Sequence, residues 1–360
     1  MVSSIKERGS RSLASLAAET RRAAQDILGE GTPANTRRSY EGAMRYWAAW
    51  HRVRIGEPIT LPLDVEVVVQ FVVDHLVRSG DDGSGVWDLP PELDRKLVEM
   101  GAKRALGPLK ISTIIHRVSV LSKVHQLKNL TINPLRDSRV QTLLMRAKKV
   151  AVGRGEGKKQ KRAITKTELN LMLDTCDDSL LGIRDAALLL VGWASGGRRR
   201  SEIGAIKVEH LRWSQRGFLL DLQRSKTNQD GESPSLPKPI TGRAAEALRA
   251  WINEAGIESG FLFRRVDSGR VGDGETPISA SAIYNIIKSR ALKAGLPGIE
   301  NWSPHSLRSG FVTEAGRRRV PIGDVMAMTE HARVDTVIGY YRAGELEASP
   351  IASMLDDAEE

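Results

Sequence analysis

The sequence contains one cysteine, Cys176, in 360 residues. A single cysteine excludes an internal disulfide framework and a Cys-rich zinc site, and it suits a reducing compartment. The chain has no uninterrupted apolar run near the roughly 20 residues of a membrane helix. Its start does not resemble a signal peptide, and its acidic residues are not clustered as a Mg²⁺ site requires. We therefore expect a soluble, cytoplasmic protein with no metal cofactor and no membrane partner.

Lysine and arginine are the residues in excess. They number 54 against 44 aspartates and glutamates, so the formal net charge is +10 and the isoelectric point is near 9.8. Clustered basic side chains gain affinity for polyanions by releasing phosphate counterions. A polyanion is therefore the large partner that we expect, and the charge alone does not identify it as DNA. The length of 360 residues predicts two domains rather than one.

The first part of the chain predicts helices only. Residues 1–30 are expected to form a basic tail with one amphipathic helix, and residues 31–152 an all-helical domain. Residues 80–109 are expected to be a long loop within it. The predicted helices are ANTRRSYEGAMRYWAAW, with Tyr40, Met44, Trp47 and Trp50 on one face, LPLDVEVVVQFVVDHLVRSG, Ile111–Leu127, and one that follows Pro134.

Three arginines of the first of these helices, Arg37, Arg38 and Arg45, lie off its apolar face. Surface helices usually carry charged residues on the side turned away from the core, so one interpretation is a solvated basic face. The other interpretation places the three guanidinium groups on DNA phosphates, which arginine can grip with two hydrogen bonds at once. The sequence favours neither.

The stretch RAKKVAVGRGEGKKQKRAITK separates the two halves of the chain. It holds nine basic residues and a single acidic one, Glu156. Its glycines predict a flexible basic linker over residues 153–163. Lys158, Lys159 and Lys161 within it are either solvated or follow a phosphate backbone.

Residues 164–345 predict a mixed domain. Helices are expected at TKTELNLML, SLLGIRDAALLLVGWAS, GRAAEALRAWINEAG and SASAIYNIIKSRALKAG, and from there to the end. Three short segments, IKVEHLRW, GFLLDLQ and SPSLPKPI, predict a small antiparallel sheet. The fold class is therefore mainly α, with an all-α N-terminal domain and an α+β second domain. Residues 346–360 predict a short helix with Ile351, Met354 and Leu355 on one face.

Four separate pieces of this second part carry groups suited to a phosphodiester. Each piece alone has an ordinary explanation, since a hairpin lysine is usually inert and a His-x-x-Arg pair on a helix is a common accident. The pieces are SGGRRRSEIGAI, with Glu202 behind three arginines; LLDLQRSKTNQ, with Lys226 at a hairpin tip; WSPHSLRSGF, with His305 and Arg308 on one helical face; and HARVDTVIGYYR, with His331 nine residues before Tyr340.

In this order and at this spacing, the four pieces resemble the tyrosine recombinase, or phage integrase, family, and the sequence looks closest to its Cre-like members. The family has an arginine before Ser/Ala-Glu, a hairpin lysine, His-x-x-Arg, and His or Trp nine residues before a nucleophilic tyrosine. Matching RRSEI to R-x-S-E-[IL] selects Arg199, with Glu202 as its acidic partner. The family usually has apolar residues on both sides of this arginine. The chain has Arg198 and Arg200 there, which leaves the register open by one residue.

The resemblance implies a role for each matched residue. Tyr340 would attack the phosphodiester, and Tyr341 would be a packing neighbour. Lys226 would protonate the leaving 5′-oxygen, while His305 would accept the proton of the tyrosine. The groups implied to bind the phosphate are Arg199, Arg308 and His331. Glu202 would support Arg199.

The resemblance also implies the reaction and its partners. It implies a core DNA-binding domain over residues 31–152 and a catalytic domain over residues 164–345. It also implies a site-specific DNA recombinase that cleaves and rejoins duplex DNA through a 3′-phosphotyrosine and a Holliday junction, with no ATP, metal or other cofactor. The expected partner is double-stranded DNA with an inverted-repeat target site, at the bacterial nucleoid, and no small-molecule substrate. The protein would be a monomer when free and a homotetramer on DNA, joined through residues 346–360.

Two alternatives remain beside this hypothesis. A type IB topoisomerase-like enzyme would use similar residues to cleave and rejoin DNA, and it would relax supercoils instead of exchanging strands. A catalytically silent DNA-binding protein would keep the scaffold and lose the chemistry. The seven matched positions argue against the silent protein.

Overall fold

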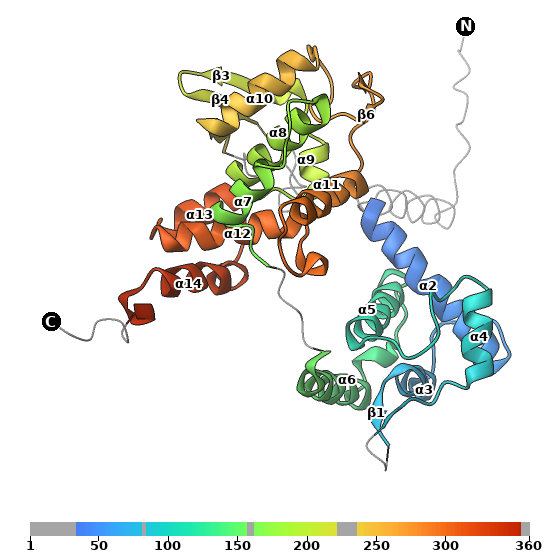
Figure 1. The fold of residues 1–360 in the computed structure, drawn as a ribbon. Coiled ribbons are helices and arrows are strands. Elements are labelled where there is room, and N and C mark those ends of the chain that lie inside the picture. The colour runs from blue at the N-terminus through green and yellow to red at the C-terminus, as the bar shows by residue number, and fades with distance from the viewer. Residues whose placement is uncertain (1–33, 81–83, 157–161, 222–235, 354–360) are drawn as a thin grey trace, which may run out of the picture. The chain divides into compact units, whose positions relative to one another are not determined.

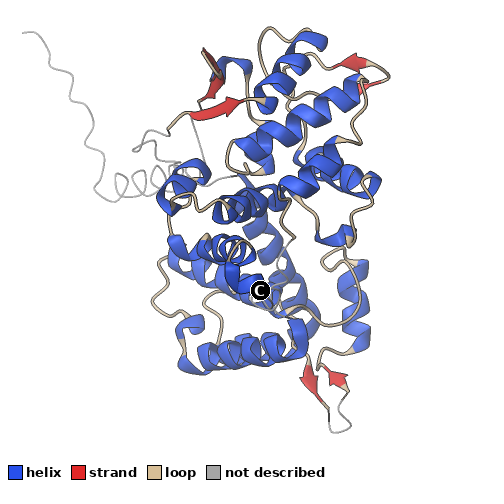
Figure 2. Ribbon diagram, turned by 60° about the vertical axis from the view of Figure 1, so that its left-hand side comes forward, coloured by secondary structure: helices blue, strands red, loops and turns tan. Residues whose placement is uncertain are grey.

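The computed structural model describes residues 34–80, 84–156, 162–221 and 236–353. The chain divides into two compact units, residues 1–159 and 160–360 (Figure 1). Helices dominate, and the strands of the described residues form only three short antiparallel sheets (Figure 2). The chain is therefore mainly α, as the sequence predicts. Within the described ranges, no helix combines the length and the apolar character needed to cross a membrane.

The described part of the first unit is built from helices around an aromatic core. Trp47, Trp50 and Phe71 are fully buried there, and the rings of Trp47 and Phe71 stack with their centroids 3.7 Å apart. The predicted apolar face of the first helix is thus the face that packs. The helices are α2 (Ala34–Ile55), α3 (Val65–His75), α4 (Pro91–Glu99), α5 (Ile111–Leu127) and α6 (Ser138–Ala151).

The prediction of one long loop over residues 80–109 is wrong. Strand β2 (Gly85–Val86) lies within this stretch and pairs with β1 (Arg78–Ser79), which directly precedes it. Helix α4 lies in the middle of the stretch. The consecutive prolines suggested a loop, but proline is favoured at the first position of a helix, where Pro91 lies. Leu97 of α4 is fully buried and ties the helix to the core of the unit.

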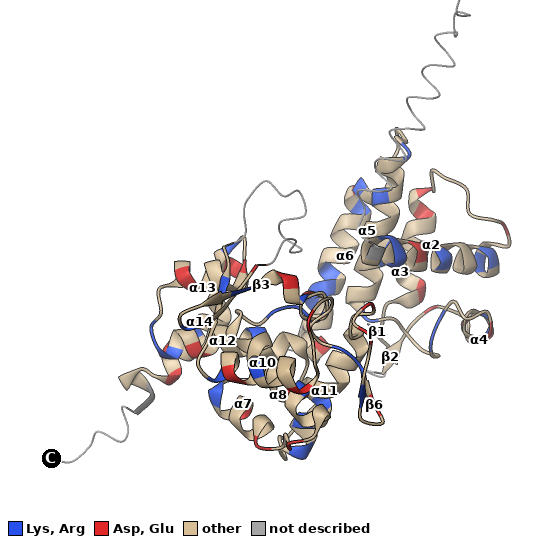
Figure 3. Cartoon of the chain, turned by 90° about the horizontal axis from the view of Figure 1, so that it is seen from above, with Lys and Arg blue, Asp and Glu red and all other residues tan. Residues whose placement is uncertain are grey.

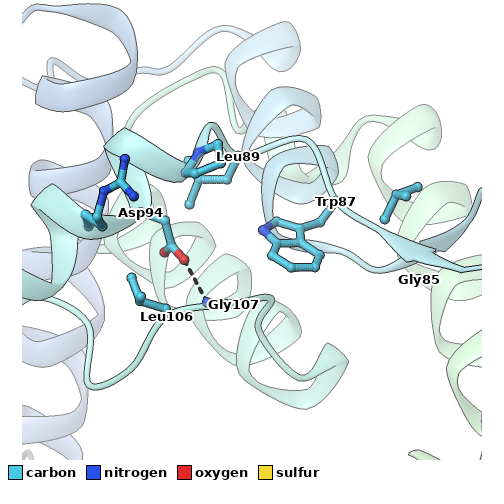
Figure 4. Close-up of a pocket in the computed structure, with 9 residues that line it drawn as sticks. Gly85, Trp87, Leu89, Asp94, Leu106 and Gly107 are labelled. Carbon is cyan, nitrogen blue, oxygen red and sulfur yellow. Dashed lines mark hydrogen bonds between the residues drawn. The ribbon is translucent and has the colours of Figure 1, made fainter.

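A buried ion pair organises the rest of this stretch. Asp94 of α4 pairs with Lys103, and its carboxylate also accepts a hydrogen bond from the main-chain N–H of Gly107 at 2.7 Å. Both charged side chains are about 5% exposed or less. A hollow of about 480 Å³, lined mainly by apolar side chains such as Trp87 and Leu106, lies beside the pair (Figure 4).

The second unit combines helices with the predicted antiparallel sheet. Strands β3 (Leu211–Ser214), β4 (Gly217–Leu220) and β5 (Lys238–Thr241) pair in that order. The sequence did not predict the hairpin of β6 (Val266–Asp267) and β7 (Arg270–Val271). The helices are α7 (Lys166–Leu173), α8 (Leu180–Ala194), α9 (Arg200–Gly204), α10 (Arg243–Glu254), α11 (Ala280–Lys293), α12 (Pro304–Arg317), α13 (Ile322–Thr329) and α14 (Ile338–Glu347).

Two glycines bring the backbones of α12 and α14 together (Figure 1). A Cβ atom on Gly344 of α14 would lie 2.0 Å from the carbonyl oxygen of Thr313, and one on Gly316 of α12 would lie 2.1 Å from that of Tyr341. Real Cβ atoms do not approach this closely, so only glycine permits the contact. The helix with the two adjacent tyrosines therefore packs directly against the helix with the His-x-x-Arg pair.

Candidate active site

The second unit brings together six of the residues that the sequence singled out. His305 and Arg308 lie one turn apart on α12. This helix begins at Pro304, and Ser306 Oγ accepts a hydrogen bond from the N–H of Ser303 at 3.1 Å, which caps the helix start. Arg308 is 4% exposed, whereas His305 faces solvent.

A Gly-Gly turn brings the arginine triplet close to α12. Gly196 and Gly197 both have a positive φ, and a Cβ atom on Gly197 would lie 2.0 Å from the Cα of Arg308. Both glycines are therefore required by backbone conformation and by space. The turn places the start of α9 beside Arg308. Arg199 is close enough there for its positive charge to lower the pKa of Arg308.

The three consecutive arginines have different environments. Arg199 Nη1 donates to Glu202 at 2.6 Å, and the Arg199 side chain keeps 30% of its surface exposed. Arg198 is fully buried, and its Nη1 lies 3.1 Å from the carboxylate of Glu330. Arg200 points to solvent. Only Arg199 is both held by Glu202 and open to a ligand, which supports the register chosen from the sequence.

Arg308 and His331 contact each other directly. Arg308 Nε donates to His331 Nε2 at 3.0 Å, so this ring nitrogen is the acceptor and carries no proton. The other ring nitrogen, Nδ1, lies 2.7 Å from Thr329 Oγ1. Thr329 is buried, and its hydroxyl donates to the carbonyl oxygen of Val325 at 2.8 Å. This chain of bonds describes a neutral imidazole with its proton on Nδ1.

The site is strongly cationic. Burial, followed by the positive charges of Arg308 and Arg199, lowers the pKa of His331 from 6.5 to about 4. Burial and the neighbouring Arg199 and Arg198 lower the pKa of Arg308 to about 10, which still leaves it charged at neutral pH. An anion placed between these groups would relieve the repulsion, so the site is prepared for a phosphate.

The two adjacent tyrosines differ in burial and in hydrogen bonding, as the consecutive arginines do. Tyr340 is half-buried, and its ring meets that of His305 edge to face, with centroids 6.1 Å apart and an interplanar angle of 68°. Burial raises the pKa of the Tyr340 phenol. Tyr341 is buried, and its hydroxyl donates to the carbonyl oxygen of Val320 at 2.6 Å. Its hydroxyl already has a structural partner.

The other residues that the sequence singled out are not among the described residues of this site. Lys226 and the linker lysines, Lys158, Lys159 and Lys161, fall outside the described residues. Arg37, Arg38 and Arg45 are exposed on α2 in the first unit, as both interpretations require. Figure 3 marks the lysine and arginine positions along the chain, including those of α2, in blue. Their contact with DNA stays a prediction.

Sequence reasoning missed a second layer of polar residues behind the site. Thr329, Glu330 and Lys238 contact its backbone or side chains, and none of them was singled out. Lys238 gave a signal, because it alternates with Pro239 and so shares the inward face of its strand with Ile240. A charged residue at an inward position calls for a buried partner.

Comparisons with known sequences agree with the motif pattern. The sequence model of the phage integrase family matches residues 162–346. The chain is 31% identical over 278 residues to an integrase/recombinase XerD homolog of Selenomonas ruminantium, an alignment covering 73% of this chain and 76% of that protein. It is 29% identical over 203 residues to the tyrosine recombinase XerC of Xylella fastidiosa, covering 54% of this chain and 63% of that protein.

Solved structures show the same fold. The Tn1549 transposon integrase in complex with transposon right end DNA has a TM-score of 0.54 at 14% identity, covering 94% of this chain and 99% of that one. A lambda integrase dimer bound to a COC′ core site has a TM-score of 0.50 at 13% identity, covering 93% and 82%. The narrower resemblance to Cre-like members stays a prediction. The match of the family over residues 162–346, together with a relative of this identity and coverage, shows that the chain belongs to the phage integrase family of tyrosine recombinases.

Proposed function

We propose that this protein is a site-specific recombinase that cleaves and rejoins duplex DNA through a 3′-phosphotyrosine on Tyr340. The observation that carries the proposal is the pairing of two contacts in one site: Arg308 with His331, and His305 with Tyr340. The first pair, with Arg199, supplies the charge for a phosphate, and the second supplies a nucleophile beside a base.

The proposed chemistry balances without an external cofactor. The Tyr340 oxygen attacks phosphorus, His305 accepts the phenolic proton, and the bond from phosphorus to the 5′-oxygen breaks. Lys226 gives a proton to that oxygen, which leaves as a 5′-hydroxyl. Because the phosphotyrosine conserves the energy of the bond, a second 5′-hydroxyl can attack it and rejoin the strand without ATP. Arginines take the charge-neutralising part that a metal ion has in other phosphoryl-transfer sites.

The DNA partner and the assembly follow from the same proposal. Two reciprocal strand exchanges require four protomers and a Holliday junction, and a target with two inverted half-sites would bind one protomer at each. The first unit would contact DNA through Arg37, Arg38 and Arg45. The linker lysines would cross the phosphate backbone, and residues 346–360 would dock on a neighbouring protomer. Solved relatives in complex with DNA support the DNA partner.

Covalent capture tests the proposal. Wild-type protein is incubated with nicked suicide duplexes that bear candidate inverted repeats, and adducts are detected by denaturing electrophoresis. Tyr340→Phe should bind DNA and form no adduct. Tyr341→Phe, the matched control, should form the adduct and lose about 1 kcal/mol of stability with its bond to Val320. An adduct that persists in Tyr340→Phe and disappears in Tyr341→Phe would reject Tyr340 as the nucleophile.

Other outcomes point to the alternatives. Relaxation of supercoiled DNA with adducts but without strand exchange indicates a topoisomerase-like enzyme. DNA binding without adducts on any duplex indicates a catalytically silent protein.

A further inference from the structure

The last turn of α13, which leads into His331, is held by basic side chains from three other segments. Three consecutive main-chain carbonyl oxygens of this turn each accept a hydrogen bond from one of them. The C-terminus of a helix carries a partial negative charge, so cations are favoured there. The donors are Lys238 of β5 to Ala327, at 2.8 Å, Arg198 to Met328, and Arg308 of α12 to Thr329.

Glu330 closes this arrangement from the other side. It directly follows α13 in the left-handed region, with φ of 54°, which a glutamate adopts only when its surroundings hold it there. Its carboxylate lies 3.1 Å from Arg198 Nη1 and 3.4 Å from Lys238 Nζ. The side chains of Arg198 and Lys238 are no more than 2% exposed. Buried cations without partners are unfavourable, so the Glu330 carboxylate stabilises both Arg198 and Lys238.

The arrangement also reaches the opposite end of the site. Arg198 Nη1 lies 3.8 Å from Glu202, the carboxylate that holds Arg199. Its Nε donates to the carbonyl oxygen of Ser195 at 2.9 Å, at the start of the Gly-Gly turn. Arg198 therefore links the turn that presents Arg199 to the turn that presents His331.

We propose that Lys238 and Arg198 are positioning residues, which act through the end of α13 and Glu330 to hold His331 against Arg308. The inference deepens the proposed function, on which its catalytic consequence rests. Neither side chain has the exposure needed to touch DNA, so their effect on a reaction must pass through the residues they hold. A shift of about 1 Å in such a group can cost on the order of 100-fold in rate.

Lys238→Met tests the proposal, because methionine fills the same space and offers no donor. Strand cleavage at saturating DNA, well below the melting temperature, should slow on the order of 100-fold, while the Kd for duplex DNA stays within about twofold. Arg264→Met is the matched control. Arg264 is also a buried cation bound to carbonyl oxygens, those of Phe261, Ser259 and Gly272, and its loss should lower stability without slowing cleavage. Equal slowing in both variants would show a general loss of stability and overturn the proposal.

A second variant separates positioning from charge neutralisation. Lys238→Met combined with Glu330→Gln removes one positive and one negative charge, so the net charge behind the site is unchanged. We expect cleavage to stay slow. Cleavage restored to the wild-type rate would mean that Lys238 only neutralises Glu330, and the proposal would be wrong.

An NMR titration of the free protein keeps this test separate from that of the proposed function. In the charge-balanced double variant, loss of the hold on α13 should let His331 move towards solvent, and its pKa should rise by about 1 unit or more towards 6.5. The groups that perturb it are Arg308, Arg199, His305 and Arg198. An unchanged pKa overturns the positioning role, whereas absence of any wild-type adduct with a shifted pKa rejects only the proposed function.

Discussion

His305 of α12 and Tyr340 of α14 meet edge to face, with ring centroids 6.1 Å apart. Burial raises the pKa of the Tyr340 phenol, so the phenol is protonated at neutral pH and needs a base before it can attack. We expect His305→Ala to slow adduct formation about 10²-fold or more at pH 7. The deficit should shrink as the pH rises, because more phenolate then forms without a base. A deficit that is the same from pH 6 to pH 10 would argue against proton transfer to His305.

The lowered pKa of His331 makes stability depend on pH. Its pKa falls from 6.5 to about 4 on folding, chiefly through burial, so the unfolded chain binds more protons between these values. The free energy of unfolding should therefore be largest above pH 6.5, fall as the pH is lowered, and level off below about pH 4. His331→Gln should flatten this dependence. Urea unfolding from pH 4.5 to 7.5 measures it as the difference between the two proteins, since His75 in the first unit adds its own contribution to both.

Thr329 should set the tautomer of His331. Its buried hydroxyl donates its hydrogen to the carbonyl oxygen of Val325, so its oxygen accepts a hydrogen bond from the Nδ1–H of His331. Thr329→Val keeps the shape and removes this partner, which should cost about 1–3 kcal/mol of stability. Thr329→Ser, the control, should retain the bond. The ¹⁵N shifts of the His331 ring report the tautomer, and identical shifts in the wild type and both variants would contradict the assignment.

Gly344 should not tolerate a side chain. A Cβ atom there would lie 2.0 Å from the carbonyl oxygen of Thr313, so Gly344→Ala must push α14 from α12 and should cost about 1–3 kcal/mol. Gly339 lies in the same helix with open space around its Cα, and Gly339→Ala should be neutral or stabilising by up to about 1 kcal/mol. Urea unfolding compares the two. Equal changes in the free energy of unfolding for the two variants would show that the contact at Gly344 does not control the result.

The C-terminal tail should act in assembly. Within the described residues it begins as a turn, Pro350–Ser353, and Ile351 is 67% exposed; Met354 and Leu355 lie outside them. Deletion of residues 349–360 should leave the melting temperature and single-site binding nearly unchanged and abolish tetramers on DNA. Melting curves and analytical ultracentrifugation with duplex test this. A much lower melting temperature would show that the tail packs on its own protomer, and normal tetramers would show that it has no part in assembly.

Local pattern was enough to predict much of the fold. The bounds of α5, Ile111–Leu127, are those predicted, because its apolar residues recur at helical spacing. α4 was missed because Pro90 and Pro91 suggested a loop, although proline also starts helices. The hairpin of β6 and β7 was missed because two-residue strands leave no periodic pattern.

In the site, too, local spacing predicted some residues and missed others. Spacing along the chain drew attention to the residues that meet in one place, such as His305 and Tyr340. It gave no access to the layer behind them. Arg198 binds the carbonyl oxygen of a residue 130 positions away, and no local pattern encodes a pair at that separation. One sign of this layer is visible in the sequence, because Arg198 stands where the family usually has an apolar residue. The ion pair of Arg198 with Glu330 explains this departure.

The glycine contact between α12 and α14 constrains how Tyr340 can move. Tyr340 lies one helical turn before Gly344, where backbone meets backbone and no side chain is present to rearrange. Small, graded adjustments of packing are therefore unavailable at this contact. Tyr340 can leave its place beside His305 only if its side chain swings out or if α14 lifts off α12 as a whole. By the second route, α14 has two states, packed against α12 or separated from it, with no stable position between them.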